Sequence, residues 1–376
     1  MLSARERRTL LLLGVLYAAV VVPVGIRRGG DFVQELPLSD RLVSGAAPLY
    51  THNPAKGVFW PPFTIAALVP FALVARASLA LSQALWAVTN VVLLAWSLTR
   101  LALRWGWRPV VLAVAAVAKP LQGNFEHQNL QVVVLALVVA AIDDLEQGFE
   151  RRSGVWVGLA TAVKIFPGLL LAYLAYRRHW RACAIGIATA CGCTVGATLR
   201  YGPRGAVAAV ADWVALSRAG MRTAGFGFQG LGLWVAGLGG SNLAIWLSMA
   251  AAAALVLAAI AARGATEEPL YEVGLVTILA VLVSPIGWFY YHLLAIPAWV
   301  AALTLPVPEG RWAGRAWRAS LIVAAVLLSG VLTFDHLYPD ALAIVQRYNY
   351  VWGEVVLVGA LAAYRLALGR RTAQPA

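Results

Sequence analysis

Charged residues are scarce in this chain, at 12% of 376 residues, whereas they make up about 25% of an average soluble protein. Hydrophobic residues account for 61% of the sequence, and the mean hydropathy is +0.75. A globular chain of this length could not bury so much apolar surface in one core, so most of the chain must contact lipid. This composition excludes a nucleic-acid-binding protein, a dinucleotide-binding domain and a secreted disulfide scaffold.

Cysteine is rare as well, and three common catalytic signatures are missing. The three cysteines, Cys183, Cys191 and Cys193, lie in one apolar stretch without the spacing of a metal or disulfide site. The sequence contains no Walker A motif, no Gly-x-Ser-x-Gly and no His-Glu-x-x-His. These absences exclude an ATP-driven pump, a serine hydrolase of that type and a zinc protease. We expect neither a metal nor another cofactor.

What the chain does contain is a series of apolar runs separated by basic clusters. A membrane span with its loop takes roughly 30 residues, because the span alone needs about 20. The chain therefore has room for about 12 transmembrane helices in a single domain over residues 1–376. The net charge of +13 is typical of arginine-rich cytoplasmic loops. We predict an all-α polytopic membrane protein with both termini in the cytoplasm, and we expect the short run 61–74 to be re-entrant.

Two longer polar intervals are predicted to lie outside the membrane, at residues 27–60 and 200–240. In the first, Ser39 can cap a short helical turn that Gly45 ends. Pro37 limits any longer helix there, because proline removes a backbone donor and clashes with the preceding turn. We expect the interval 27–60 to be the catalytic loop.

Polar and aromatic side chains gather at the predicted outer ends of the spans. Polar groups in lipid cost about 2.5–3.5 kcal/mol each, so their gathering at one face indicates a site there. A transport path would instead need polar groups near the middle of the membrane. The candidate site residues are Asp31, Tyr50, Trp60, His127, Gln128, Asn129, Lys164, Tyr291, His292 and Arg347.

Asp31 is the candidate general base. It follows Gly29 and Gly30 directly after the first span, so its carboxylate is held near the membrane surface, where it can take a proton from a hydroxyl. The alternative is a solvated loop acid. The segment 126–129, Glu-His-Gln-Asn, either hydrogen-bonds a sugar or satisfies exposed helix ends.

Two further candidates also have simpler explanations. Lys164 lies in an apolar run just before Pro167, where we expect the helix to break. Its amine either binds a phosphate or extends along the apolar surface to reach the interface. His292 follows Trp288, Tyr290 and Tyr291, and it is either a site residue or part of an interfacial aromatic belt.

Several of these residues belong to sequence elements that occur in a fixed order over residues 27–300. The elements are Asp31, SGAAPLY (Ser44–Tyr50), VFWPPF (Val58–Phe63), HQNL (His127–Leu130), GLATAVKIFPGLLL (Gly158–Leu171) and SPIGWFYYHLL (Ser284–Leu294). In this order the chain resembles glycosyltransferase family 87. It departs from the family pattern where His127 replaces a glycine, where Gly287 replaces a serine and where Tyr291-His292 replaces a histidine pair. The spacing between Gln128 and Asn129 is also compressed.

The resemblance implies a membrane-embedded glycosyltransferase of the GT-C type, a helical bundle with extracytoplasmic loops. Such an enzyme transfers a sugar, often mannose, from a polyprenyl-phosphate-linked donor to a lipid or glycan acceptor, with inversion. By analogy, Asp31 would be the general base, and His292 and Lys164 would face the donor phosphate. The site would lie on the outer face of the cytoplasmic membrane. The expected partners are donor, acceptor and membrane lipids, not nucleic acid, and nothing in the sequence requires more than a monomer.

Other functions remain compatible with the same residues. The enzyme could transfer arabinose or another hexose by the same mechanism. A lipid or sugar-lipid transporter would tolerate the loss of Asp31 if other residues carried the substrate. A non-catalytic subunit of an envelope-building complex would use its outer charges only for docking.

Overall fold

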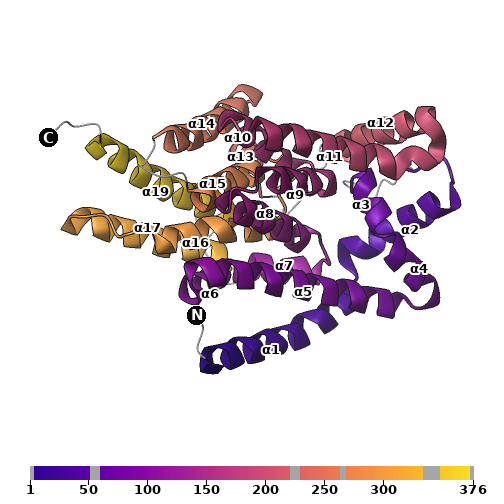
Figure 1. Cartoon of the computed structure of the whole chain (residues 1–376), viewed down its shortest axis with the longest axis horizontal. Helices are drawn as coiled ribbons and strands as arrows, with labels where there is room; N and C mark the ends of the chain where they lie inside the picture. The colour runs from indigo at the N-terminus through magenta and orange to yellow at the C-terminus, as the bar shows by residue number, and fades with distance from the viewer. Residues whose placement is uncertain (1–3, 51–59, 221–228, 263–267, 333–347, 373–376) are drawn as a thin grey trace. The chain divides into compact units, whose positions relative to one another are not determined.

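The protein is all-helical, as the sequence predicts (Figure 1). Every regular element in the described part of the computed structural model is a helix. The described residues are 4–50, 60–220, 229–262, 268–332 and 348–372. They form two compact units. The first comprises Met1–Arg100 and Gln122–Ala224, and the second comprises Leu101–Leu121 and Gly225–Ala376.

The first unit holds most of the elements with candidate residues. Its elements are α1 (Ala4–Arg28), α2 (Gly30–Ser44), α3 (Pro62–Ala67), α4 (Val69–Ala77), α5 (Leu79–Trp105), α7 (Ala118–Glu126), α8 (Gln131–Glu146), α9 (Glu150–Val163), η1 (Phe166–Gly168), α10 (Leu169–Tyr176), α11 (Trp180–Thr198), η2 (Leu199–Tyr201) and α12 (Gly202–Gly220). Two of these helices, α5 and α7, have residues in both units.

The second unit contains the C-terminal helices and one earlier helix. Its elements are α6 (Trp107–Ala116), α13 (Leu231–Gly237), α14 (Asn242–Ala261), α15 (Pro269–Leu282), η4 (Phe289–Ala295), α16 (Ile296–Thr304), α17 (Arg311–Ser329) and α19 (Asn349–Thr372). Close backbone approach brings neighbours together. A Cβ on Gly274 of α15 would meet the backbone of Ala298 in α16, and one on Gly353 of α19 would meet Leu328 of α17.

A sharp turn between α1 and α2 sets the position of Asp31. Gly29 and Gly30 have φ angles of 73° and 50°, which glycine adopts at little cost because it lacks a Cβ. The chain therefore leaves one helix and enters the next without a loop, and Asp31 lies in the first turn of α2.

The predicted short turn inside residues 27–60 is instead a helix of 15 residues. The expectation that Pro37 would limit it is wrong, because α2 passes through this proline, whose side chain is exposed. Gly45 does end the helix in a left-handed conformation, as predicted. The longer helix places Glu35 one turn after Asp31, on the same face.

Aromatic packing fixes α2 against the helices that follow it. Phe32 is fully buried. Its ring stacks on Trp86 of α5 at a centroid distance of 5.2 Å and meets the edge of Phe71 of α4 at 5.9 Å. Such aromatic pairs contribute about 0.5–1.5 kcal/mol beyond the area they bury. The residue next to Asp31 is thus an anchor, which restricts the position of the carboxylate.

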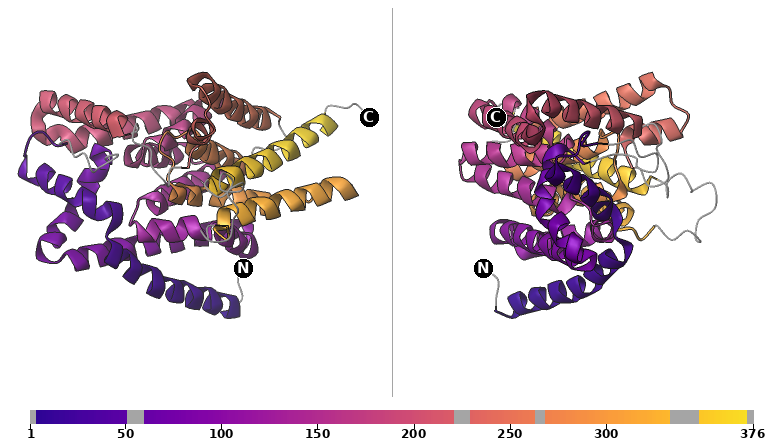
Figure 2. Two further views of the ribbon diagram at one scale, coloured as in Figure 1. Left: turned by 180° about the vertical axis from the view of Figure 1, so that it is seen from behind. Right: turned by 90° about the vertical axis from the view of Figure 1, so that its right-hand side faces the viewer.

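Helices α9 and α11 pack closely within the first unit (Figures 1 and 2). Gly154 and Gly158 lie four residues apart on α9, and a Cβ on either would collide with backbone atoms of α11 at Ala182 or Gly186. Small residues at this spacing allow helix backbones to approach closely in a membrane. The predicted break near Pro167 is confirmed, since α9 ends at Val163 and the turn Phe166–Gly168 leads into α10.

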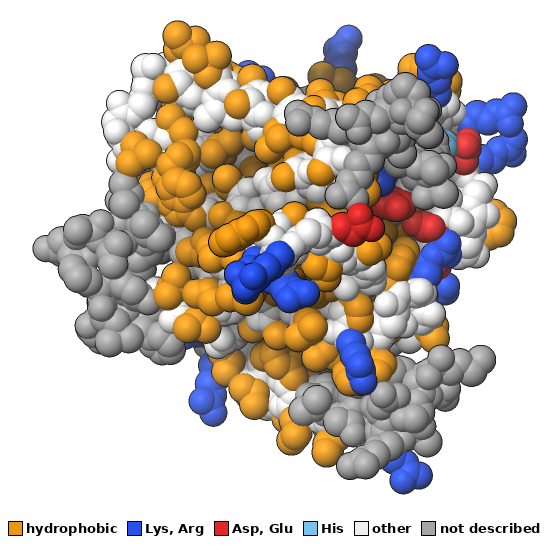
Figure 3. All heavy atoms as spheres, turned by 90° about the vertical axis from the view of Figure 1, so that its left-hand side faces the viewer, with side chains coloured by type: hydrophobic (Ala, Val, Ile, Leu, Met, Phe, Trp, Pro, Cys, Tyr) orange, Lys and Arg blue, Asp and Glu red, His pale blue; other side chains and the backbone are white. Residues whose placement is uncertain are grey.

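Four helices in the described part are long and apolar enough to cross a membrane. They are Leu79–Trp105, the continuous segment Trp180–Arg218, Asn242–Ala261 and Asn349–Leu368. Large apolar side chains on them are exposed, including Leu103, Val207 and Trp246, each with more than two thirds of its surface accessible. One face of the molecule accordingly shows mainly hydrophobic side chains, with a few charged groups among them (Figure 3). These features are those of a membrane protein.

The structure describes two of the expected intervals in more detail. Residues 61–74, expected to be re-entrant, lie in the two short helices α3 and α4, each too short to span lipid, so the re-entrant path stays a prediction. Within residues 200–240, expected to be a loop, α12 continues the apolar segment that begins with α11.

Candidate functional site

Asp31 is held by two contacts with the segment that precedes α8. Its backbone N–H donates to the carbonyl of His127 at 2.8 Å. Its carboxylate oxygen Oδ2 accepts a hydrogen bond from the side-chain amide of Asn129. These partners lie about a hundred residues further along the chain, with a separation of 98 for the side-chain pair. The structure therefore brings together three of the predicted site residues, Asp31, His127 and Asn129.

Asn129 is itself held firmly. Its Oδ1 accepts hydrogen bonds from the Leu130 N–H at 2.7 Å and from Gln131 Nε2 at 3.3 Å. The Asn124 side chain accepts the backbone N–H of Gln131 at 3.0 Å. All of these side chains are buried. With its oxygen occupied, Asn129 presents its N–H donors to Asp31, so the Asp31 carboxylate oxygen is the acceptor of this bond.

The sequence reasoning missed Gln131 and Asn124. Both are fully buried, at 0% exposure. A polar residue at the start of the long apolar run of α8 is a signal that could have identified Gln131, because a buried amide needs hydrogen-bond partners. Asn124 lies in a polar segment and had no such signal.

Gln128, also predicted to bind substrate, points elsewhere. Its Nε2 donates to the carbonyl of Gln83 on α5 at 3.3 Å, and its own carbonyl accepts from Trp86 Nε1 at 2.9 Å. Its backbone has a φ of 47°, an uncommon conformation that separates its side chain from those of its neighbours. The structure gives Gln128 the role of joining this turn to α5.

A second group of candidates surrounds Trp60, which contacts Glu35, the residue one helical turn after Asp31 on α2. Trp60 donates its backbone N–H to Glu35 Oε1 at 3.3 Å, and its carbonyl accepts from the Tyr50 hydroxyl at 2.8 Å. The Lys164 Nζ lies over the Trp60 ring at 5.9 Å from the centroid. The structure thus joins the predicted residues Tyr50, Trp60 and Lys164 through one tryptophan.

Burial shapes the chemistry of this second group. Glu35 is 2% and Lys164 8% exposed, so opposite charges lie in a poorly hydrated region, where their fields act strongly. Burial raises the pKa of Tyr50 well above its usual value, and the nearby Glu35 carboxylate raises it further. Tyr50 is therefore a neutral hydrogen-bond donor at physiological pH. Glu35 is not among the site residues predicted from the sequence.

The backbone conformation of Lys164 and two hydrogen bonds nearby position this side chain. It terminates α9 in an extended conformation, which turns its side chain away from the helix. The Thr64 hydroxyl donates to the carbonyl of Val163 at 2.8 Å, and the Ser39 hydroxyl donates to that of Ile65 at 2.8 Å. These bonds join α2, α3 and the end of α9. The break before Pro167 is therefore what brings a cation beside α2.

The second unit holds His292 and Tyr291, both buried in the turn η4. The His292 Nδ1 lies 2.9 Å from Glu354 Oε1 of α19, and both side chains are fully buried. The His292 ring stacks on Tyr350 at 5.6 Å. Glu354 was not identified from the sequence, although a carboxylate within an apolar span is a signal. Arg347 lies outside the described residues.

The arrangement has the parts of a base-catalysed transfer. A fixed carboxylate can accept a proton, and a buried cation on a second element can stabilise a developing anion. Within the described ranges, no group of three or more histidine, cysteine, aspartate or glutamate side chains could hold a metal ion.

Comparison with known proteins identifies the family of the chain. The sequence profile of glycosyltransferase family 87 matches residues 59–285, which is more than half of the chain. A relative from Mycolicibacterium smegmatis is 27% identical over 354 residues, covering 82% of this chain and 77% of the relative. It is named polyprenol-phosphate-mannose-dependent alpha-(1-2)-phosphatidylinositol mannoside mannosyltransferase. No solved structure matches significantly. The chain therefore belongs to glycosyltransferase family 87 and is a membrane glycosyltransferase.

Proposed function

We propose that this enzyme transfers mannose from a polyprenyl-phosphate-linked donor to a lipid or glycan acceptor, with inversion at the anomeric carbon. The observation that carries the proposal is the hydrogen bond between Asn129 and Asp31, which orients one carboxylate in the turn that begins α2. The relative from Mycolicibacterium smegmatis supports the donor class and the sugar, because its name includes both. Arabinose or another hexose is the alternative sugar.

Asp31 acts as the general base in this proposal. It takes the proton of the acceptor hydroxyl while the hydroxyl oxygen forms a bond to the anomeric carbon. The bond from that carbon to the phosphate oxygen breaks, and the polyprenyl phosphate leaves with the electron pair. A positioned base of this kind contributes roughly 10²–10⁴-fold to a rate. The Asn129 donor keeps the carboxylate oriented throughout the step.

Lys164 stabilises the leaving group. The donor phosphodiester carries one negative charge, and the departing phosphomonoester gains a second. A fixed cation therefore stabilises the transition state more than the ground state. Trp60 and Tyr50, which are both buried, hold the region around the lysine in shape. His127, whose carbonyl binds the Asp31 N–H, and Tyr291 complete the proposed substrate contacts.

His292 is assigned to the donor phosphate in this proposal by its place in the family pattern. Its ring is held in η4 by the contact of Nδ1 with Glu354 Oε1 at 2.9 Å. We also propose that Arg347 binds the donor phosphate, because its side chain is positively charged. Gln128 does not contact substrate in this proposal. It connects the segment that contains Asn129 to α5 through its hydrogen bonds.

The proposed placement in the membrane follows from the charge distribution along the chain. About 12 spans in a GT-C type bundle would leave both termini in the cytoplasm, with residues 27–60 on the extracytoplasmic side. The site would face that side of the cytoplasmic membrane, where a lipid-linked donor enters sideways from the bilayer. Such a monomer needs no metal for the chemistry described.

The test uses purified protein in detergent with radiolabelled polyprenyl-phosphate-mannose and bacterial membrane lipids. Wild-type protein transfers label to lipid or glycan, and Asp31→Asn lowers the rate by at least 100-fold while the thermal unfolding temperature stays the same. The matched control is Asp40→Asn on the same helix, whose carboxylate pairs with Arg76 at 2.8 Å. Full transfer by Asp31→Asn would remove the base assignment. Movement of labelled lipid across a bilayer without transfer would favour a transporter.

A further inference from the structure

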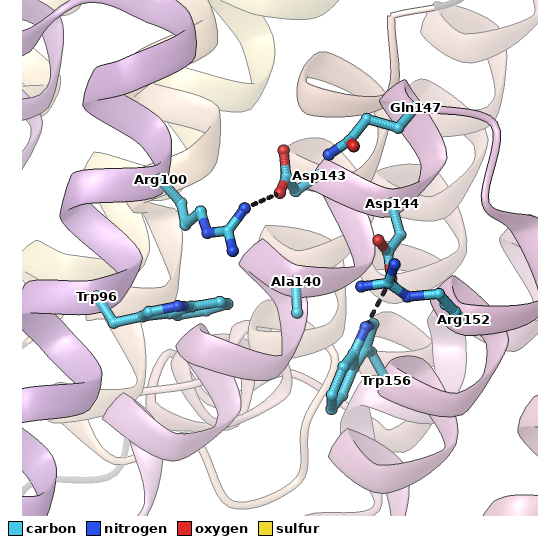
Figure 4. A pocket seen from close by; sticks show the side chains of 8 residues that line it. All are labelled: Trp96, Arg100, Ala140, Asp143, Asp144, Gln147, Arg152 and Trp156. Atoms are coloured by element: carbon cyan, nitrogen blue, oxygen red, sulfur yellow. Dashed lines mark hydrogen bonds and ion pairs between the residues drawn. The ribbon is translucent and has the colours of Figure 1, made fainter.

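A separate pocket lies at the other end of α8 from Asp31. It has a volume of about 250 Å³ and is formed by side chains of α5, α8, α9 and the turn that follows α8 (Figure 4). Its lining residues are Trp96, Arg100, Ala140, Asp143, Asp144, Gln147, Arg152 and Trp156. At a rise of about 1.5 Å per residue, Asp143 lies about 20 Å along the helix axis from the position of Asn129. The pocket is therefore not part of the candidate catalytic site.

Two pairs of opposite charges line this pocket (Figure 4). Arg100 pairs with Asp143 at 2.9 Å, and the Nε of Arg152 lies 3.3 Å from Asp144. The indole N–H of Trp156 donates to the same Asp144 oxygen at 2.7 Å. With two arginines and two aspartates, the lining has no net charge. A ligand that carries both a positive and a negative group matches such a lining better than one with a single charge.

The lining also provides two indole rings. The Arg100 guanidinium lies over the Trp96 ring at 5.4 Å, which shows that a cation is accommodated against this face. Trp156 forms the opposite side of the pocket in Figure 4. Indole faces attract ammonium groups, because the ring has a negative electrostatic face. The carboxylates of Asp143 and Asp144 in the lining add hydrogen-bond acceptors for an ammonium group.

The position of the pocket suits a lipid. Trp96 and Arg100 belong to the C-terminal part of α5, one of the four apolar helices long enough to cross a membrane. Tryptophan and arginine are typical of the region where a span meets the headgroups. The Arg100 side chain is 47% and the Arg152 side chain 65% exposed, so both can rotate towards a phosphate at the surface.

We propose that this pocket binds the headgroup of a zwitterionic aminophospholipid. Its primary ammonium lies between the indoles and donates to Asp143 and Asp144, and its phosphate accepts from Arg100 and Arg152. The pocket volume corresponds to about eight waters at roughly 30 Å³ each, which is comparable to the non-hydrogen atoms of a phosphoethanolamine group. The inference does not depend on the sugar donor or the acceptor.

A neighbouring surface hollow provides an internal contrast. It is lined by Glu150, Arg151, Arg152 and Arg181, together with Gly148 and Phe149. Three arginines against one glutamate give this hollow a net positive charge, which favours anionic lipids through attraction alone. Selectivity for an amine over a plain anion therefore distinguishes the proposed pocket from a general basic surface.

The test measures lipid binding by native mass spectrometry of the detergent-purified full chain. Phosphatidylethanolamine, phosphatidylglycerol and phosphatidylcholine with identical acyl chains are titrated separately. Phosphatidylethanolamine should bind about tenfold more tightly than either of the others, because only its primary ammonium can donate charged hydrogen bonds to the aspartates. Equal binding of phosphatidylglycerol would overturn the proposal in favour of a basic surface.

Variants assign the binding to the pocket. Asp143→Asn and Arg100→Gln should each weaken phosphatidylethanolamine binding about tenfold, with unchanged thermal unfolding in lipid-free detergent. Arg104→Gln is the control, since Arg104 lies one turn further along α5 and contacts the Trp105 ring at 5.5 Å in the same manner, but does not line the pocket. If Asp143→Asn and Arg100→Gln bound phosphatidylethanolamine as tightly as the control Arg104→Gln, the assignment of the binding to this pocket would be overturned. Binding of soluble glycerophosphoethanolamine as tight as that of the lipid would overturn the lipid as its source.

Discussion

Replacing Asn129 by alanine tests whether the orientation of Asp31 limits catalysis. The substitution removes the donor to the Asp31 carboxylate and leaves Asp31 itself in place. A hydrogen bond to a charged group contributes about 1.5–3 kcal/mol, and about 1.4 kcal/mol corresponds to a tenfold change. If that bond holds the carboxylate in its reactive position, kcat should fall by roughly 10- to 100-fold. The KM for the donor should change little, because the donor phosphate binds elsewhere.

The assay is the initial rate of label transfer from polyprenyl-phosphate-mannose, measured over a range of donor concentrations. Alanine also removes the acceptor for Leu130 and Gln131, so some loss of stability is expected. Asn90→Ala controls for this effect, because Asn90 is equally buried on α5 and its amide donates to Trp86 O at 2.9 Å within the same helix. We expect a comparable decrease in unfolding temperature for this control, with normal transfer.

Three results would refute the reasoning. A kcat within twofold of wild type in folded Asn129→Ala would mean that the Asn129–Asp31 bond has no catalytic role. An equal loss of transfer in Asn90→Ala would mean that instability accounts for the effect. A rise in KM without a change in kcat would assign Asn129 to substrate binding.

Other predictions concern the cation, the buried pair in the second unit and helix packing. Lys164→Met should lower kcat/KM by at least tenfold, and Lys164→Arg should recover part of it because the charge is retained; equal activity of the two variants would contradict a role for the charge. Glu354→Leu should lower the free energy of unfolding by roughly 3–5 kcal/mol because His292 loses its buried partner, whereas Glu354→Gln, which keeps a polar oxygen beside His292, should cost less in thermal unfolding assays. Gly158→Leu should destabilise the fold by about 1–3 kcal/mol or more because its side chain meets α11, while Gly192→Leu, with open space around it, should unfold at the wild-type temperature.

The membrane character and the family could be predicted from the sequence because they depend on composition and on the order of short elements. Apolar content decides which solvent surrounds the chain, wherever each residue lies in space. The helix ends at Gly45 and before Pro167 were also predictable, since glycine and proline act on the backbone locally.

The tertiary structure alone decided which side chains meet. Asp31 and Asn129 are 98 positions apart, and no local pattern indicates that Asn129 turns towards Asp31 while Gln128 turns towards α5. Glu35 accepts the backbone N–H of Trp60, 25 residues further along the chain, a contact that no local pattern indicates. Glu354 pairs with His292 through packing of α19 on η4. Such contacts depend on how whole helices pack, and that packing is set by many small apolar contacts that no short segment of sequence encodes.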